Sequence, residues 1–132
     1  MATLRIVLPA RLGRDLNALG LSAPDYEVLS TLSERPDRCW RLRDFAHKMQ
    51  WSRSRLSHHA ARMEQRGLIT REPDPDDARG SIYRLTGVGY ATLVEAAPGH
   101  VRSVRDRFID HLTPDELALL AKVSSRIADL PD

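Results

Sequence analysis

Cysteine, lysine and long apolar runs are scarce in this chain. Cys39 is the only cysteine among the 132 residues, so no disulfide can form within one chain, and we expect a reducing compartment. No apolar run approaches the ~18 residues that a membrane-spanning helix needs, and the N-terminus lacks the pattern of a secretory signal. We therefore expect a cytoplasmic protein that has no membrane partner.

Charge is present in both signs but is unevenly distributed. The net charge is only +2, yet residues 35–84 hold twelve basic and seven acidic residues, whereas the remainder holds eight basic and eleven acidic residues. Only Lys48 and Lys122 are lysines, and arginine is the residue suited to bidentate contacts with phosphate and guanine. The basic middle therefore indicates a polyanion-binding surface. A solvated surface with clustered arginines is the alternative.

Apolar residues recur mainly at helical spacing. This periodicity, together with serine and threonine caps, predicts helices over residues 10–20, 22–34, 42–49, 52–66, 86–110 and 113–130. Pro9 and Gly13 interrupt the pattern near the N-terminus, and Pro98 should kink or interrupt the fifth helix.

Two short strands are expected at residues 68–72 and 81–85, joined by an exposed, turn-rich loop over residues 73–80. Residues 39–41 are too short to assign, although they could form a small strand. The sequence thus predicts one mostly α domain over residues 1–132 with a small β-hairpin.

The segments at 42–49 and 52–66 have the spacing of a helix-turn-helix. The second begins with two arginines and has no acid before Glu64, although the positive end of the helix dipole normally favours acids. A recognition helix enters the major groove by its N-terminal end, so arginine and hydroxyl side chains there can read base edges. The residues expected to contact DNA are Arg53, Ser54, Arg55, Ser57, His58, Arg62 and, from the hairpin, Arg79.

The hairpin completes a winged helix-turn-helix over about residues 22–86. Arg79, near the expected loop tip, could reach a flanking minor groove. Asp77 is expected to pair with Arg79 or another arginine and so to hold the wing in shape. A merely solubilising turn is the alternative. The acids of the loop lack the spacing of a calcium-binding loop, so we expect no metal.

These motifs resemble the multiple antibiotic resistance regulator (MarR) family of bacterial winged-helix regulators. The resemblance covers about residues 20–95. The most specific match is the wing motif, Asp-x-Arg followed by a strand and Leu-Thr-x-x-Gly, together with the Glu-x-x-Gly-Leu that precedes it. The matching segments are Leu21-Ser22, Tyr26-Glu27-Val28-Leu29, Trp51 to Ser57, Met63 to Ile69, Arg71 to Gly80 and Leu85-Thr86-Gly87-Val88-Gly89.

The resemblance implies a homodimer joined by terminal helices at about residues 4–20 and 87–130. Such dimers bind pseudo-palindromes whose half-sites lie about one helical turn apart. Members are usually repressors, and a small, frequently aromatic ligand often releases them from DNA. The residues expected at the dimer interface are Leu8, Leu12, Leu16, Leu112, Leu117, Leu120 and Ile127, although the last four could instead belong to an intramolecular core.

Two other classes of function are less well supported. A winged helix that binds protein instead of DNA conflicts with the arginine-rich, acid-poor start of 52–66. An enzyme would need a glycine-rich phosphate loop, a nucleophile with a base, or a set of metal ligands, and the sequence contains none of these. We expect no catalytic residue and no cofactor.

Five further residues need an interpretation. Neighbours on a helix point about 100° apart, so His58 and His59 cannot chelate together, and we expect His58 to face DNA and His59 a packing edge. Cys39 could be an oxidation sensor, but a small buried apolar residue is the preferred interpretation. Trp40 and Trp51 flank the 42–49 helix and are expected to seal the core.

Overall fold

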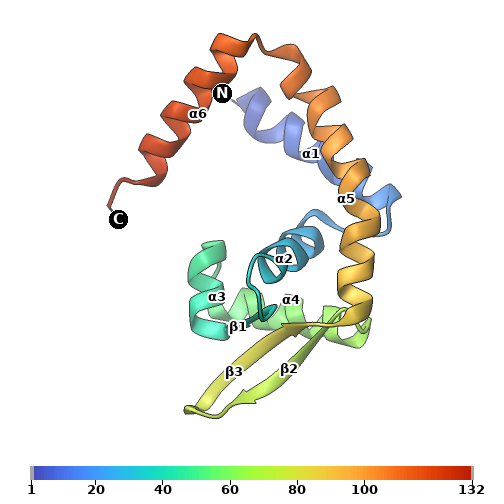
Figure 1. Cartoon of the computed structure of the whole chain (residues 1–132), viewed down its shortest axis with the longest axis vertical. Coiled ribbons are helices and arrows are strands. Elements are labelled where there is room, and N and C mark those ends of the chain that lie inside the picture. Colours follow the sequence, from blue (N-terminus) through green and yellow to red (C-terminus); the bar gives the residue numbers. More distant parts are fainter. Residues whose placement is uncertain (1, 132) are drawn as a thin grey trace.

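A computed structural model of the chain describes residues 2–131. Six α-helices, one 3₁₀ turn and three strands make up these residues (Figure 1). In chain order they are α1 (Ala2–Ala18), α2 (Ala23–Ser33), β1 (Cys39–Arg41), α3 (Leu42–Met49), α4 (Arg53–Gln65), β2 (Ile69–Asp74), β3 (Asp77–Leu85), α5 (Gly87–Arg107), η1 (Ile109–His111) and α6 (Pro114–Ala128). The predicted mostly α fold with a small antiparallel sheet is confirmed.

The helices α2, α3 and α4 and the sheet form the lower part of the molecule, while α1, the far end of α5 and α6 form its upper part (Figure 1). The hydrophobic core lies in the lower part and draws on α2, α3, α4, the sheet and the first half of α5. Its fully buried large side chains include Val28, Leu29, Leu32, Phe45, Leu56, Met63, Ile69 and Tyr83. Trp40 and Trp51 pack against this cluster, so the prediction that they seal the core is confirmed.

The sheet is antiparallel with strand order β1-β3-β2, and residues 39–41 form its edge strand. The expected eight-residue loop over 73–80 is wrong, because β2 and β3 remain paired as far as Asp74 and Asp77. Carboxylates close the turn: Asp74 accepts from the backbone N–H of Asp76 and Asp77 from that of Arg79. A Cβ at Gly80 would lie 3.2 Å from both aspartate Cβ atoms, so glycine permits this close packing.

Both prolines that were expected to interrupt helices lie inside continuous ones. The first helix begins at Ala2, not at residue 10, and runs through Pro9. Its partner α5 runs through Pro98 and bends along its length without a break (Figure 1). A proline removes one helical hydrogen bond. The two helices are joined by Asp15 on α1, which pairs with Arg107 and accepts a hydrogen bond from Ser103 on α5.

The Leu-Thr-x-x-Gly motif has a direct structural explanation at the start of α5. The Thr86 hydroxyl accepts from the Gly89 N–H at 2.9 Å and lies 2.7 Å from the Gly67 carbonyl, to which it donates. A Cβ at Gly89 would lie 2.0 Å from the Leu68 carbonyl oxygen, so only glycine fits. This junction fixes the first turn of α5 against the root of the wing.

None of the helices within residues 2–131 is long and apolar enough to cross a membrane.

Candidate nucleic-acid interface

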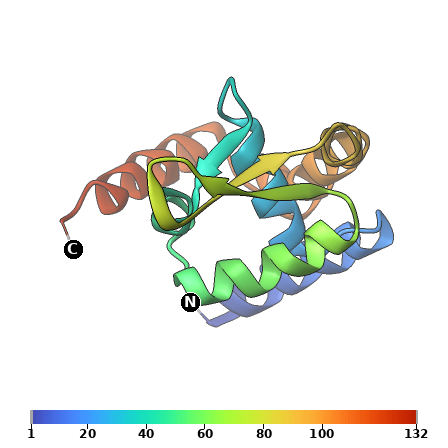
Figure 2. The ribbon, with the colours of Figure 1, turned by 90° about the horizontal axis from the view of Figure 1, so that it is seen from below.

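The recognition helix α4 is fixed by a cap at one end and by its apolar face along its length. The chain leaves α3 at Gln50 in the left-handed conformation, and Ser52 then caps α4 by accepting from the Arg55 N–H at 3.0 Å. Leu56, Ala60 and Met63 are fully buried. Most other residues of α4 are exposed, and the view from below shows the helix alongside the wing (Figure 2).

The predicted DNA-contacting residues of α4 occupy two regions of its surface. Arg53, in the first turn, lines a cleft towards the wing. Arg55 lies on the edge of the helix near Trp51, with its guanidinium 3.8 Å from the centre of the Trp51 ring. This cation–π contact holds an exposed arginine in one orientation. Ser54 and His58 are exposed and Ser57 is half-buried.

A polar cleft of about 560 Å³ lies between α3, the start of α4 and the wing. Arg53 and Arg79 both line it, and so do Arg41 and Arg43. The structure therefore brings together the first-turn and wing arginines singled out from sequence, 26 residues apart in the chain, whereas Arg55 is not among the lining residues.

Two aspartates of the wing pair with an arginine that the sequence analysis did not assign. Arg41, at the end of β1, forms an ion pair with buried Asp74 at 3.6 Å and a hydrogen-bonded pair with Asp76. Asp77 contacts the backbone of Arg79, not its guanidinium. Within residues 2–131, Arg53 and Arg79 form no ion pair, so both guanidinium groups in this cleft are available to phosphate or bases.

Cys39 is half-buried and free. Burial raises the pKa of its thiol, and the nearby Asp37 carboxylate raises it further. Because the thiolate is the reactive form, this environment favours the small buried apolar role over an oxidation sensor.

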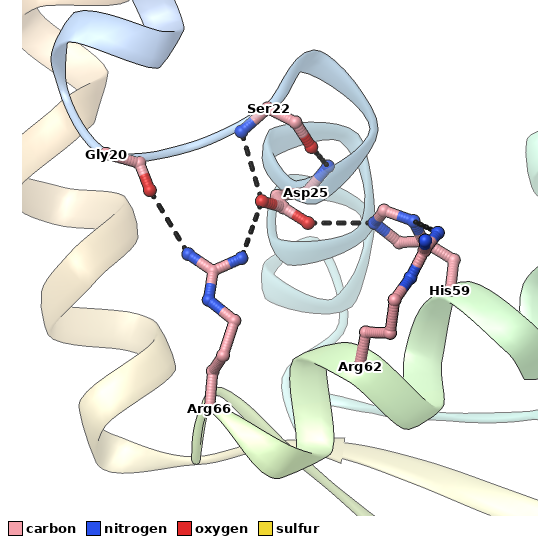
Figure 3. Close-up of polar contacts among 6 residues, drawn as sticks. All are labelled: Gly20, Ser22, Asp25, His59, Arg62 and Arg66. Carbon is pink, nitrogen blue, oxygen red and sulfur yellow. Dashed lines mark hydrogen bonds and ion pairs between the residues drawn. The ribbon is translucent and has the colours of Figure 1, made fainter.

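His59 does more than form the expected packing edge. Its Nε2 lies 2.8 Å from the carboxylate of Asp25 at the start of α2, and its Nδ1 lies 3.2 Å from Arg62 (Figure 3). Arg66, which directly follows the last residue of α4, also pairs with Asp25 at 2.8 Å. Sequence reasoning missed this cluster because its members lie 34 and 41 residues apart, although the spacing 59, 62 and 66 does place three of them on one face of α4.

The leucines expected at a dimer interface differ widely in exposure. Leu16 is only 2% exposed within a single chain, so it cannot offer a surface to a partner, and that expectation is wrong. Leu117 and Ile127 on α6 are 37% and 62% exposed. The remaining four, Leu8, Leu12, Leu112 and Leu120, are half-buried.

The sequence pattern of the MarR family matches residues 21–81. The transcriptional regulator HosA of Escherichia coli O111:H- is 31% identical over 106 residues, which cover 78% of this chain and 74% of HosA. The fold matches that of AbsC, a MarR family transcriptional regulator from Streptomyces coelicolor, with a TM-score of 0.89 and 41% identity over 96% of this chain and 85% of AbsC. The chain belongs to the MarR family.

Sco3205 from the same organism, solved in complex with DNA, is 38% identical over 93% of this chain and 78% of its own, with a TM-score of 0.88. This MarR-family protein is accordingly a DNA-binding transcriptional regulator and not an enzyme.

Proposed function

We propose that this MarR-family protein is a repressor that binds a pseudo-palindromic operator as a homodimer. The supporting observation is the cleft that Arg53 and Arg79 line together without ion-pair partners in the described chain. With α4 in a major groove, the same placement would let the wing follow the backbone towards the adjacent minor groove, where a narrow groove attracts arginine.

The dimer is supported by apolar surface that one chain leaves uncovered. The helix α6 has no buried residue among its fifteen. Its large exposed apolar residues and those of α1 are Leu4, Ile6, Leu117, Leu119 and Ile127. A second copy that covers these faces would place two recognition helices on one side of the duplex, about one helical turn apart.

In this dimer, residues 22–86 act as the DNA-binding core, and residues 4–20 and 87–130 act as the dimerisation arms. A dimer that occupies two successive grooves excludes other proteins from that DNA, which is the action of a repressor.

Release by a small ligand is supported by a second cleft, of about 480 Å³, between α1 and α2. Its lining is mainly apolar and includes Leu12 and Tyr26, and the ring of His100 lies 4.3 Å from that of Tyr26. In the described part of the chain the buried His100 Nδ1 has no hydrogen-bond partner, and burial lowers the pKa of this ring. An aromatic ligand with one polar group would fill the apolar space and satisfy that nitrogen.

Selection of bound duplexes from a random pool tests the proposal most directly. We expect a symmetric motif with half-sites about 10 base pairs apart, bound with at least a thousandfold preference over random DNA. Binding that shows no sequence preference at moderate salt would overturn the operator proposal and leave the winged helix as a protein-interaction module.

A further inference from the structure

The carboxylate of Asp25 has more partners than a helix cap requires. Asp25 and Ser22 form the capping box of α2, in which the Ser22 N–H donates to Asp25 Oδ2 at 3.0 Å. The same carboxylate receives His59 on Oδ1 and Arg66 on Oδ2, both at 2.8 Å (Figure 3). Arg66 also donates to the Gly20 carbonyl at 3.1 Å. One side chain thus joins the α1–α2 turn, the start of α2 and two turns of the recognition helix.

Asp25 is ionised in this arrangement although it is only 5% exposed. Burial would raise the pKa of the carboxyl group, but the hydrogen bonds from Arg66 and Ser22 outweigh burial and leave its pKa below the ordinary value. A buried carboxylate that lost these donors would be strongly disfavoured. The contacts from α4 are therefore a condition for the charge of Asp25.

The hydrogen-bond partners define the protonation state of His59. Arginine has only donors, so the contact between Arg62 Nη2 and His59 Nδ1 requires an unprotonated Nδ1. The ring proton then lies on Nε2 and is donated to the Asp25 carboxylate. Trp51 packs edge-on against the same ring, with 5.7 Å between the ring centres.

We propose that His59 is a positioning residue which, in its neutral form and anchored by Asp25, holds the guanidinium of Arg62 in place for contact with DNA. The inference rests on the proposed operator binding. Among residues 2–131, His59 is the only hydrogen-bond partner of the Arg62 guanidinium and takes one N–H, which leaves the others for a phosphate or base. An arginine already held in its binding geometry loses less conformational freedom when it binds.

This contact with Arg62 can form only while Nδ1 of His59 carries no proton. Protonated His59 would carry an N–H on Nδ1, which would replace the acceptor for Arg62 with a donor and place two cations side by side. The charged groups that face His59 are Asp25 from α2 and Arg62 from its own helix, while Arg66 acts through Asp25.

A double-mutant cycle on operator affinity tests this role. Arg62→Ala is expected to weaken binding about tenfold and His59→Gln about fivefold at about pH 7.5. The double variant is expected to match Arg62→Ala alone, because His59 acts through Arg62. A double variant about fiftyfold weaker than wild type would overturn the proposal, since the two residues would then act independently.

The tautomer of His59 can be measured without any variant or DNA. The ring nitrogen resonances of the ¹⁵N-labelled full-length protein at neutral pH should show Nδ1 unprotonated and Nε2 protonated. A proton on Nδ1 would overturn the proposal even if the operator is bound. Conversely, a chain that binds no specific DNA would defeat the proposed function, while the ring resonances would still decide whether His59 is set to hold Arg62.

Discussion

Helices α4 and α6 are of similar length but are stabilised in different ways. The thirteen residues of α4 include three that are fully buried within the chain, whereas the fifteen residues of α6 include none. Both helices have caps, so their ends do not explain the difference. An amphipathic helix is stabilised mainly by burial of its apolar face. The recognition helix is therefore stabilised by its own chain, whereas a single chain leaves α6 without a buried face, and the proposed dimer would cover it.

The largest expected effect is on the intramolecular side of this comparison. Leu56→Ala removes a fully buried side chain from the contact between α4 and the core, so we expect the free energy of unfolding to fall by about 2 to 5 kcal/mol. Chemical denaturation at several protein concentrations measures it. The loss should be the same at every concentration, and a loss confined to dilute protein would show that α4, like α6, relies on a second copy.

The proposed role of α6 in dimerisation is tested by placing a charge on its exposed apolar face. Leu119 is 61% exposed in one chain, and Leu119→Asp should weaken dimerisation by about 2 to 4 kcal/mol because an interface would bury the new carboxylate without a partner. Sedimentation equilibrium gives the association constant, and Ser124→Asp on the same helix is a control for added charge. If Leu119→Asp leaves the association constant unchanged, this face of α6 does not lie in the interface.

The wing is tested by Arg79→Ala. Since Arg79 forms no ion pair within the described residues, its removal should leave the thermal stability unchanged but cost roughly 1 to 3 kcal/mol in operator binding. Fluorescence anisotropy with labelled operator measures this, and Arg105→Ala on α5 serves as an arginine control. An unchanged dissociation constant would remove the wing arginine from the mechanism.

The smallest expected effect concerns the joint between α1 and α5. Hydrogen bonds from Arg107 and Ser103 lower the pKa of Asp15 to about 2, from an ordinary value of 3.8. The stabilisation from this lowered pKa is complete above about pH 4 and is lost as the pH falls from 4 towards 2. Thermal unfolding followed over that range should show a smaller acid-induced loss for Asp15→Asn than for wild type. Asp110→Asn, on the exposed η1 turn, should follow the wild-type curve.

Local signals account for most of what the sequence predicted correctly. The helix-turn-helix was placed within about one residue because Ser52 is a cap and Gly67 a stop, both of which act within a few residues. The wing motif was also recognisable, since Thr86 and Gly89 serve one tight junction. DNA binding followed from these elements together.

Tertiary contacts account for what the sequence did not predict. The turn of the wing is shorter than expected because Asp74 and Asp77 accept backbone hydrogen bonds that depend on the strands being paired. The helix α1 continues through Pro9 where local propensity predicted a break. The role of Asp25 was not predicted, because nothing near it in the chain reveals that His59 and Arg66 converge on it.

The length of α5 sets how precisely the two chains of the proposed dimer would have to be aligned. Its 21 residues span about 31 Å from the junction made by Thr86 and Gly89 to the end that α1 contacts. If a helix of that length is tilted by about 5° at one end, its other end moves by roughly 3 Å. That distance is close to the rise of one base pair, so in the proposed dimer a small change at the interface would move both recognition helices out of register with successive grooves.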